Sequence, residues 1–441
     1  MSATDTIFAL SSGSLPSGVA VIRLSGPESC NALAQLCGRV PAARHASLAT
    51  IRNRNGEKLD EGIVLFFPAP NSFTGEDCVE LQIHGGRATV KAVLAALAHM
   101  AGLRPAEAGE FSRRAFLNGR MDLVEVEGLA DLIAAETEMQ RRLAAEQASG
   151  GLSRLYDSWA KRLTHARAMI EAELDFADEE DVPGSVASFI WSDMEGLEQE
   201  ILNHLAEARV GEIVRDGLNV VIAGPPNAGK SSLLNHLAKR DVAIVTNVPG
   251  TTRDVLHVDL DLSGFAVRLY DTAGLRDTDD IVEQEGIRRT RLSMAEAHLV
   301  LLLSDAADPD WSVLNGSYGG PIIRVRTKAD VAEPHWPRRT EDVTISVASG
   351  EGIAGLLEVI GRHLPELESG SALALPTRQR HIQNLADVRA HILAAIQADE
   401  HGLDIQAEHL RLAGQSLGRV TGRVDVENLL DVIFSEFCIG K

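Results

Sequence analysis

Residues 224–231 read Gly-Pro-Pro-Asn-Ala-Gly-Lys-Ser, a complete G-x-x-x-x-G-K-[ST] pattern in the middle of a chain of 441 residues. Glycines let the backbone turn so that several N–H groups point inward at phosphate oxygens. In this pattern Lys230 reaches the β- and γ-phosphates and the hydroxyl of Ser231 binds Mg²⁺. The apolar run 218–223 before the loop and the helical run after it, from Ser232, predict the strand–loop–helix order of a nucleotide-binding domain. The alternative is a glycine-rich turn without a ligand.

The segments that follow this loop decide between GTP and ATP. An expected strand at 265–270 leads into Asp271, whose carboxylate suits a Mg²⁺-bound water and is followed by glycine for a γ-phosphate contact. Another strand, 321–326, leads into Thr-Lys-Ala-Asp at 327–330, an [NT]-K-x-D element. The Asp330 carboxylate can accept from guanine N1–H and the 2-amino group, which adenine lacks, and Lys328 can lie along the plane of the base. The segment 346–348 fits the last base-contacting loop. Thr-Lys-Ala-Asp alone is compatible with a surface turn, but the correct order of all the elements indicates GTP.

Two features bear on hydrolysis. Leu275 follows Asp-Thr-Ala-Gly, at the position where Ras-like proteins place a glutamine that orients water. Because leucine cannot hydrogen-bond to water, hydrolysis must use another group. The segment 246–254 contains Thr252, the natural second Mg²⁺ ligand of a switch I loop; the alternative is a solvated turn.

The predicted GTP-binding residues lie in five segments. Thr327 stands where asparagine is commoner, and Val347 stands where alanine is usual. Lys230 and Thr252 are also expected to act in hydrolysis. Ser231 and Thr252 are expected to bind Mg²⁺ directly, and Asp271 through water. The full set is Gly224, Asn227, Ala228, Gly229, Lys230, Ser231, Ser232, Thr246, Asn247, Val248, Pro249, Gly250, Thr251, Thr252, Asp271, Thr272, Ala273, Gly274, Thr327, Lys328, Ala329, Asp330, Ser346, Val347 and Ala348.

Three motifs carry a resemblance to a known family. Asn-Ala-Gly-Lys-Ser-Ser-Leu-Leu-Asn at 227–235, Pro-Gly-Thr-Thr-Arg-Asp-Val at 249–255 and Asp-Thr-Ala-Gly-Leu-Arg at 271–276 resemble the TrmE/Era/Der branch of bacterial GTPases. The ending Phe-Cys-Ile-Gly-Lys at 437–441, the Asp-Thr-Ile start at 5–7 and the GTPase inserted in a helical domain narrow it to the MnmE (TrmE) family of tRNA modification GTPases. The resemblance covers essentially the whole chain.

The resemblance implies a way to hydrolyse GTP without a glutamine. In the family a potassium ion supplies positive charge between the β- and γ-phosphates, where the transition state spreads negative charge. The matching ligands are Asn227, Thr246, Val248 and Thr251, and the loop is ordered when two G domains meet across a dimer. The water-orienting acid of the family corresponds to Glu283. Without the resemblance Glu283 would be taken for a solvated charge at a helix start.

The resemblance also implies a folate site in the first domain. The family domain is similar to aminomethyltransferases, dimerises and binds a tetrahydrofolate derivative, either 5-formyl- or methylene-tetrahydrofolate. The matching residues are Arg23, Glu80, Arg120 and the C-terminal Lys441. A carboxylate can read the pterin edge and cations suit the glutamate tail; taken alone, each residue fits a solvated strand face or helix end. The segment 11–18 lacks the arginine usual in the family, which leaves the role of that loop open.

The implied reaction is modification of C5 of the wobble uridine in certain tRNAs, with a flavoprotein partner, MnmG, that carries FAD. The chain is therefore expected to be a homodimer within a heteromeric complex. Its formal net charge of −21 is unlike that of nucleic-acid binders. The partner is accordingly expected to provide the main grip on tRNA.

Composition is that of a globular protein, with 45% hydrophobic and 24% charged residues. No run reaches the apolar length of a membrane span, and the first residues lack the positive region of a signal peptide. The four cysteines form neither a C-x-x-C pair nor a zinc pattern, which indicates reduced thiols. These features predict a cytoplasmic protein.

The organisation expected from these patterns is multidomain. Residues 1–119 alternate strand-like runs with turns and form an α+β, folate-binding-like domain. Residues 120–215 and 371–441 show helical periodicity, with a stripe of Leu155, Trp159, Leu163, Ala166, Ile170 and Leu174 in the first part. These two parts are expected to form one discontinuous all-α domain. An α/β phosphate-loop (Ras-like) G domain, 216–370, is inserted between them.

Two other functions are compatible with parts of this pattern. A ribosome-assembly GTPase would be expected to carry an appended, often basic, RNA-binding module, whereas this chain ends in acidic helices. A folate-binding scaffold with a degenerate GTPase is disfavoured by the intact Lys230, Ser231, Thr252, Asp271 and Asp330.

Overall fold

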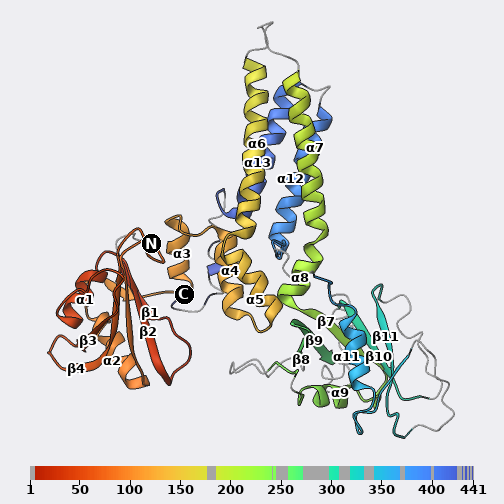
Figure 1. The fold of residues 1–441 in the computed structure, drawn as a ribbon, viewed down its shortest axis with the longest axis horizontal. Coiled ribbons are helices and arrows are strands. Elements are labelled where there is room, and N and C mark those ends of the chain that lie inside the picture. The colour runs from red at the N-terminus through yellow and green to blue at the C-terminus, as the bar shows by residue number, and fades with distance from the viewer. Residues whose placement is uncertain are drawn as a thin grey trace, which may run out of the picture. The chain divides into compact units, whose positions relative to one another are not determined.

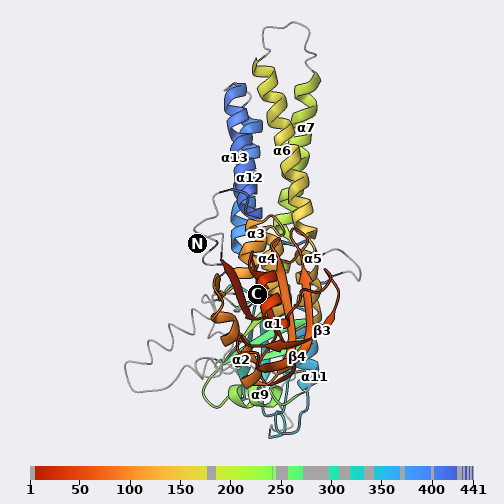
Figure 2. The ribbon, with the colours of Figure 1, turned by 90° about the vertical axis from the view of Figure 1, so that its left-hand side faces the viewer.

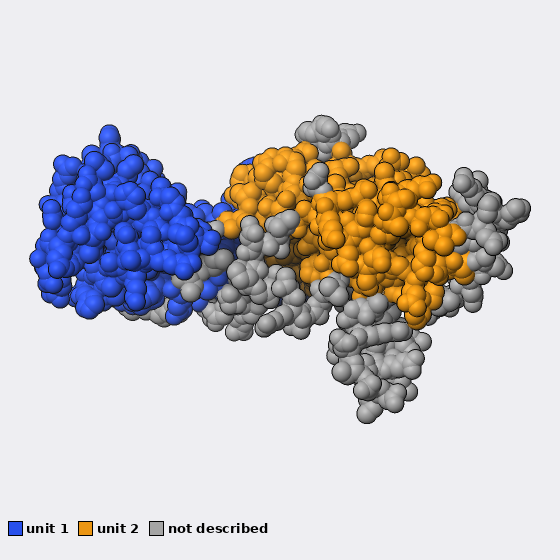
Figure 3. Space-filling view, turned by 90° about the horizontal axis from the view of Figure 1, so that it is seen from below, with its two compact units in different colours: residues 1–130, 153–190, 390–441 blue, residues 131–152, 191–389 orange. Residues whose placement is uncertain are grey.

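The computed structural model describes residues 5–175, 185–240, 242–244, 257–271, 297–306, 318–331, 342–367, 373–398 and 402–424, with five positions beyond them, Leu430, Ile433, Phe434, Phe437 and Gly440. The chain divides into two compact units, coloured separately in Figure 3. Residues 1–130, 153–190 and 390–441 form the first unit, and residues 131–152 and 191–389 form the second. None of the described helices is long and apolar enough to cross a membrane.

The first unit contains a six-stranded sheet in the order β3-β4-β5-β2-β1-β6. Neighbouring strands are antiparallel except for β1 and β6, which are parallel. Helices α1 and α2 cover one face (Figures 1 and 2). Their apolar side chains join those of the strands in one core. The elements are β1 (Thr6–Leu10), β2 (Ser17–Ser25), α1 (Ser29–Cys37), β3 (Ser47–Arg52), β4 (Lys58–Phe67), β5 (Cys78–Gly85), α2 (Arg87–Ala98) and β6 (Leu103–Pro105).

Close backbone contacts hold the end of the chain against the first domain. Gly109 has φ of +64°, and a Cβ atom there would lie 2.5 Å from the carbonyl oxygen of Phe434. Phe434 packs with Leu123 and Phe437 in an apolar cluster. The hydroxyl of Ser11 donates to the Gly440 carbonyl at 2.7 Å. This part of the unit contains α3 (Glu110–Leu117), α4 (Leu123–Ala134, of which residues 131–134 belong to the second unit), α6 (Gly151–Asp175, of which residues 151–152 belong to the second unit) and α13 (Leu403–Thr421).

The predicted apolar stripe of α6 is confirmed in its middle and differs at its ends. Trp159, Leu163, Ala166 and Ile170 are buried, whereas Leu174 is 39% exposed. At the other end Tyr156 is fully buried and Leu155 only partly. A helix has 3.6 residues per turn, so a strict three- and four-residue series drifts off the buried face over 25 residues.

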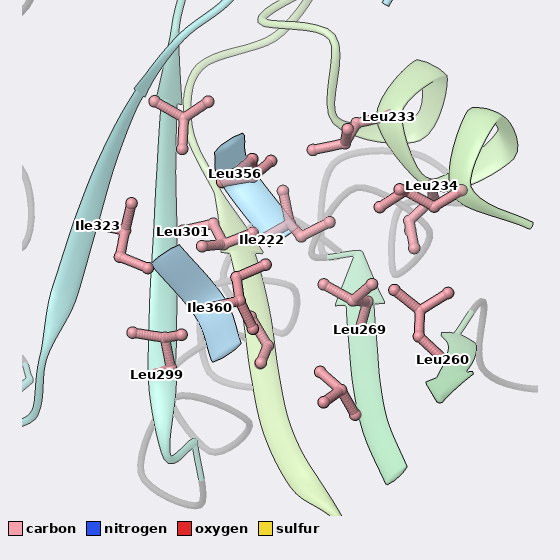
Figure 4. Close-up of a cluster of buried hydrophobic side chains, with 14 of the residues drawn as sticks. Ile222, Leu233, Leu234, Leu260, Leu269, Leu299, Leu301, Ile323, Leu356 and Ile360 are labelled. Atoms are coloured by element: carbon pink, nitrogen blue, oxygen red, sulfur yellow. The ribbon is translucent and has the colours of Figure 1, made fainter. Parts of the chain in front are cut away.

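The second unit contains another six-stranded sheet, in the order β12-β11-β10-β7-β9-β8. All its pairs are parallel except β8 with β9. Apolar side chains of the strands pack against those of α9 and α11 in a single cluster (Figure 4). The elements are β7 (Leu218–Ala223), α9 (Lys230–Leu237), β8 (His257–Leu262), β9 (Phe265–Asp271), β10 (Leu299–Ser304), β11 (Ile322–Arg326), β12 (Val343–Thr344) and α11 (Ile353–Gly361).

The strand order of this sheet places β7 between β9 and β10. The chain places β8 and β9 on one side of β7, and then β10, β11 and β12 on the other side. The strand order therefore reverses at β7. In open parallel sheets, ligands bind beyond the carboxyl ends of the strands at such a point. The phosphate loop follows β7 directly.

Side chains from helical segments of the second unit hydrogen-bond to the chain on both sides of this sheet, just before β7 and after its last strand. Asp131 accepts from the guanidinium of Arg215, just before β7, and from that of Arg378, after the sheet, at 3.3 and 2.9 Å. Gln140 donates to the Arg215 carbonyl at 3.0 Å and Gln147 donates to the Leu375 carbonyl at 3.2 Å. We call these six residues, Asp131, Gln140, Gln147, Arg215, Leu375 and Arg378, the clasp. The helices of this unit are α5 (Glu138–Ala148), α7 (Ser185–Ala206, to which the first unit contributes residues 185–190), α8 (Ala208–Asp216) and α12 (Gln379–Gln397, of which residues 390–397 belong to the first unit).

Acidification is expected to destabilise the second unit through His204. Burial, with the nearby His381 as the second cause, lowers the pKa of His204 from 6.5 to about 4. Between these values the unfolded chain binds a proton that the folded chain does not. Because the folded-state pKa is the lower one, stability present above pH 6.5 is lost as the pH falls toward 4, by about 3 kcal/mol from this group.

Thermal unfolding midpoints at pH 7.5 and pH 4.5 measure this effect. The loss on acidification should be smaller in His204→Gln than in the wild type. His363→Gln, a change at an exposed histidine, is the matched control and should follow the wild type. An equal loss in all three proteins would contradict the assignment to His204.

Candidate functional site

The phosphate loop has the backbone geometry that its glycines predict. Gly224 has φ of +146°, and a Cβ atom there would lie 2.3 Å from the carbonyl oxygen of Leu303 in β10. Gly229 has φ of +91° and Asn227 has φ of +64°, both in the left-handed region. Helix α9 begins at Lys230. The loop therefore needs glycine at its first position and ends on a helix N-terminus, where unpaired N–H groups favour a phosphate.

The polar side chains predicted for the phosphate end lie close together. Lys230 is buried, and its ammonium group donates to the carbonyls of Gly224 and Pro225, both at 2.8 Å. The hydroxyl of Ser231 donates to the carboxylate of Asp271 at 2.6 Å. Asp271 ends β9, which pairs with β7 in parallel, so the strand register sets this contact. A hydroxyl beside a carboxylate is a hard oxygen donor set of the kind that Mg²⁺ prefers.

The predicted base-contacting segments also come together. Ser346 donates its hydroxyl hydrogen to the carboxylate of Asp330 at 2.5 Å. The Ala329 N–H donates to the Ile345 carbonyl at 3.1 Å, which joins the two loops through their backbones. A buried ion pair, Arg326 with Asp342 at 2.9 Å, ties the end of β11 to the residue before β12. The hydrogen bond from Ser346 therefore fixes the orientation of the Asp330 carboxylate.

Thr327 joins the phosphate loop to the Thr-Lys-Ala-Asp segment at 327–330, which we call the base loop. Its side chain is 1% exposed, and its hydroxyl donates to the Ala228 carbonyl at 2.8 Å. A hydroxyl is enough to make this bond, which explains how threonine is accommodated where asparagine is commoner. Val347 packs against the apolar core of the sheet. A valine therefore gains burial at a position where alanine is usual.

Several predicted residues lie outside the described residues. Asn227 is the one predicted potassium ligand that the described part of the chain includes, and it is exposed in the phosphate loop. The potassium site and the catalytic acid accordingly stay predictions. The others are Thr246, Asn247, Val248, Pro249, Gly250, Thr251, Thr252, Thr272, Ala273, Gly274, Leu275 and Glu283.

In the first unit, two of the predicted folate residues meet. Arg23 and Glu80 are directly opposite in the antiparallel pair β2 and β5. The guanidinium donates twice to one carboxylate oxygen, at 2.8 and 3.1 Å, and also lies 4.8 Å from the ring centroid of Phe73. Each side chain is 20% exposed. The pair forms a half-buried polar spot beside aromatic rings.

The other two folate residues are placed less completely. Arg120 follows α3 and is exposed, with its side chain near Gly75, where an added Cβ atom would lie 3.2 Å from Cγ of Arg120. Lys441 lies outside the described residues. Its neighbour Gly440 lies against Leu10 and accepts from Ser11, in the strand-to-loop region next to Arg23.

A cavity of about 740 Å³ in the first unit was not anticipated from the sequence. It lies along α2 and β1, and Arg23, Glu80 and Arg120 do not line it. Its apolar lining has the same residue types as the neighbouring core, so sequence patterns cannot mark it. The lining includes Phe8, Leu10, Leu15, Arg87, Val90, Lys91 and Leu94.

Asp305 was also missed by sequence reasoning. Its carboxylate receives the ammonium group of Lys328 at 2.5 Å. Lys328 itself has φ of +59°, in the left-handed region. The sequence marks Asp305 only by its place after the apolar run 299–304, so its role could be recognised only once the strand order was known.

Comparison with known proteins supports one family over the whole chain. The model described as the GTP-binding protein TrmE N-terminus matches residues 6–120, and that of the MnmE helical domain matches residues 123–438. The "tRNA modification GTPase MnmE" of Rhizobium meliloti is 62% identical over 441 residues, with 100% of both chains covered. That of Sinorhizobium medicae is 62% identical over 443 residues with the same coverage, and that of Brucella canis is 54% identical, covering 99% of this chain and 98% of its own.

Among solved structures, Era of Aquifex aeolicus bound to GDP and aluminium fluoride matches with 25% identity. It covers 40% of this chain and 67% of its own, with a TM-score of 0.27, which supports no conclusion by itself. The family assignment rests on the full-length relatives and on the family models, and the phosphate loop, Asp271 and Asp330 stand where the motifs require them. The chain belongs to the MnmE family of tRNA modification GTPases.

Proposed function

We propose that this chain hydrolyses GTP to GDP and phosphate and that it does so in the modification of C5 of the wobble uridine of certain tRNAs. The observation that carries the GTPase is the convergence of Lys230, Ser231 and Asp271 at one edge of the parallel sheet, with Asp330 and Ser346 at the same edge. The tRNA reaction follows from the family, whose full-length relatives are named for it.

The roles of the phosphate-end residues follow from their positions. Lys230 now donates to loop carbonyls, and a bound nucleotide would offer its ammonium group the β- and γ-phosphate oxygens instead. Ser231 and Thr252 would bind Mg²⁺ directly and Asp271 would bind it through a water molecule; the ion neutralises developing charge on the phosphates when bound. Loop N–H groups and the N-terminus of α9 stabilise the same charge without reorganising.

The base end selects guanine through Asp330. Its carboxylate can accept two hydrogen bonds from the guanine edge. The carboxylate stays oriented because the hydroxyl of Ser346 also donates to it. An adenine edge would leave that carboxylate facing a ring nitrogen without a proton, which is costly for a desolvated charge. This geometry favours GTP over ATP.

Hydrolysis is proposed to depend on potassium and on Glu283. Leu275 cannot orient water, so another group must, and Glu283 takes that role. Asn227, with Thr246, Val248 and Thr251, would hold the potassium ion where charge develops in the transition state. The left-handed backbone of Asn227, uncommon for a non-glycine residue, fits a position whose side chain has to face a ligand.

The first unit is proposed to bind the tetrahydrofolate derivative that carries the transferred carbon. Glu80, held by Arg23 beside Phe73, offers an acceptor for the pterin edge and an aromatic wall for its ring. Arg120 and Lys441 would bind the glutamate tail. The contact of Gly440 with Ser11 supports a place for Lys441 near this spot.

The proposed partners are a second copy of the chain, the FAD-carrying flavoprotein MnmG and tRNA, in the cytoplasm. The net charge of −21 supports a division of labour in which the flavoprotein grips most of the tRNA. The two G domains would meet to complete the potassium site.

Loss of this chain is expected to remove the C5 modification from wobble uridines. The measurement is nucleoside analysis of tRNA from a strain lacking the gene, complemented by the wild type or by Lys230→Ala. The wild type should restore the modification and Lys230→Ala should not, because phosphate binding requires the ammonium group. Unchanged wobble uridines in the deletion strain would refute the proposed reaction.

GTP hydrolysis should be much faster in KCl than in NaCl at equal ionic strength, because the cation site selects the larger ion. The initial rate of phosphate release measures this. Asn227→Ala should lose most of the stimulation, whereas Asn235→Ala, a matched change at an exposed position of α9, should keep it. Equal wild-type rates in the two salts would exclude the cation mechanism.

Glu283→Ala should retain GTP binding and lose hydrolysis by about a hundredfold or more, the usual contribution of a positioned acid or base. Equilibrium titration with a non-hydrolysable GTP analogue and single-turnover hydrolysis separate the two effects. Glu285→Ala is the control. Undiminished turnover in Glu283→Ala would remove this residue from the mechanism.

A further inference from the structure

Asp305 and Lys328 are brought together by the register of two parallel strands. Ser304 is directly opposite Arg326 in the pair β10 and β11, and the Thr327 N–H donates to the Ser304 carbonyl at 2.9 Å. Asp305 follows Ser304 and Lys328 follows Thr327, so both side chains leave the sheet at the same edge. The Ala306 N–H donates to the Ser304 hydroxyl at 3.2 Å, which fixes the turn that presents Asp305.

The contact between the two side chains is a short ion pair. Nζ of Lys328 lies 2.5 Å from Oδ2 of Asp305, and the two side chains are 47% and 32% exposed. The hydrogen bond from Lys328 lowers the pKa of Asp305, so the carboxylate stays charged under ordinary conditions. Lys328 also has φ of +59°, in the left-handed region, which is uncommon for a residue other than glycine.

The neighbouring side chains of the same loop have anchors of their own. Thr327 donates to the Ala228 carbonyl of the phosphate loop at 2.8 Å, and Asp330 accepts from Ser346 at 2.5 Å. Lys328 is the third polar side chain of this segment. Its partner Asp305 directly follows β10, a strand that carries none of the nucleotide motifs. The base loop is thus fixed from three different directions.

We propose that Asp305 is a positioning residue for guanine-nucleotide binding, which holds the stem of Lys328 along the plane of the base. This inference rests on the proposed GTP site. An exposed ion pair adds little to folding stability, so its effect is in orientation. The four-carbon stem of lysine otherwise samples many rotamers, and a nucleotide that must order it binds more weakly.

The first test compares nucleotide affinities of the full-length chain by calorimetry. Asp305→Ala should raise the dissociation constant for GDP about fivefold, which is within the range for immobilising one long side chain on binding. The factor should be equal for IDP, which lacks the 2-amino group, because Lys328 contacts the ring face and Asp330 reads the edge. The turnover number at saturating GTP should change by less than about twofold.

Glu408→Ala is the matched control, because it removes another exposed ion pair, with Arg411 at 2.7 Å in α13. It should leave both affinities unchanged. An affinity of Asp305→Ala within twofold of the wild type would overturn the proposal. So would a loss for GDP that is not shared by IDP, since that would place Asp305 on edge recognition.

A double-mutant cycle separates positioning from a general structural role. If Asp305 acts through Lys328, Asp305→Ala combined with Lys328→Met should bind GDP no more weakly than Lys328→Met alone. Additive losses would show that Asp305 acts independently of Lys328, and they would overturn the proposal.

The same titrations separate this inference from the proposed function. Wild-type protein that binds ADP as tightly as GDP would refute guanine recognition itself. Wild-type protein that is selective for GDP, with an unaffected Asp305→Ala variant, would refute only the positioning role. The thermal unfolding midpoint of Asp305→Ala should equal that of the wild type, because an exposed ion pair adds little to stability. An equal midpoint excludes misfolding as the cause of the affinity loss.

Discussion

The close approach of Gly224 to the carbonyl of Leu303 is the constraint on which the nucleotide site depends. A Cβ atom would lie 2.3 Å from that oxygen, so no other residue lets the phosphate loop leave β7 so near to β10. The loop consequently begins against the neighbouring strand and turns back onto α9. Asp271, Asp305 and Thr327 end the adjacent strands or follow them, and they meet the loop at one edge of the sheet.

The rigidity of that edge comes from the core beneath it. The parallel strands are buried on both faces, and their side chains join those of α9 and α11 in one cluster (Figure 4). Polar residues at the strand ends are then held by short contacts, from Ser231 to Asp271, from Thr327 to Ala228 and from Ser346 to Asp330. The clasp centred on Asp131 holds the chain before β7 and after the sheet, within the same unit as the site.

Sequence patterns predicted the local elements of this site and missed contacts between distant segments. The strand, loop and helix around the phosphate loop and the strands before Asp271 and Thr327 are confirmed. The hydrogen bond between Asp330 and Ser346 was seen only in the structure. Asp305 was missed, because one carboxylate among 63 acidic residues has no signal until β10 and β11 are placed in register. The stripe on α6 is confirmed in the middle and weaker at its ends, where Leu155 is partly buried and Leu174 is 39% exposed, because small errors in helical phase accumulate toward the ends. The potassium ligands beyond Asn227 and the acid Glu283 stay predictions.

The sequence by itself determined the nucleotide class and the family, since a glycine-rich loop, a strand-end carboxylate and a Thr-Lys-Ala-Asp segment each act through a few consecutive residues whose chemistry is local. Tertiary structure alone decided which side chains hold those residues in place. The partners of Arg23, Lys328 and Arg378 are 57, 23 and 247 positions away in the chain. Such contacts arise because strand register and helix packing bring distant segments of the backbone together. The separation of two segments along the chain does not determine their distance in space.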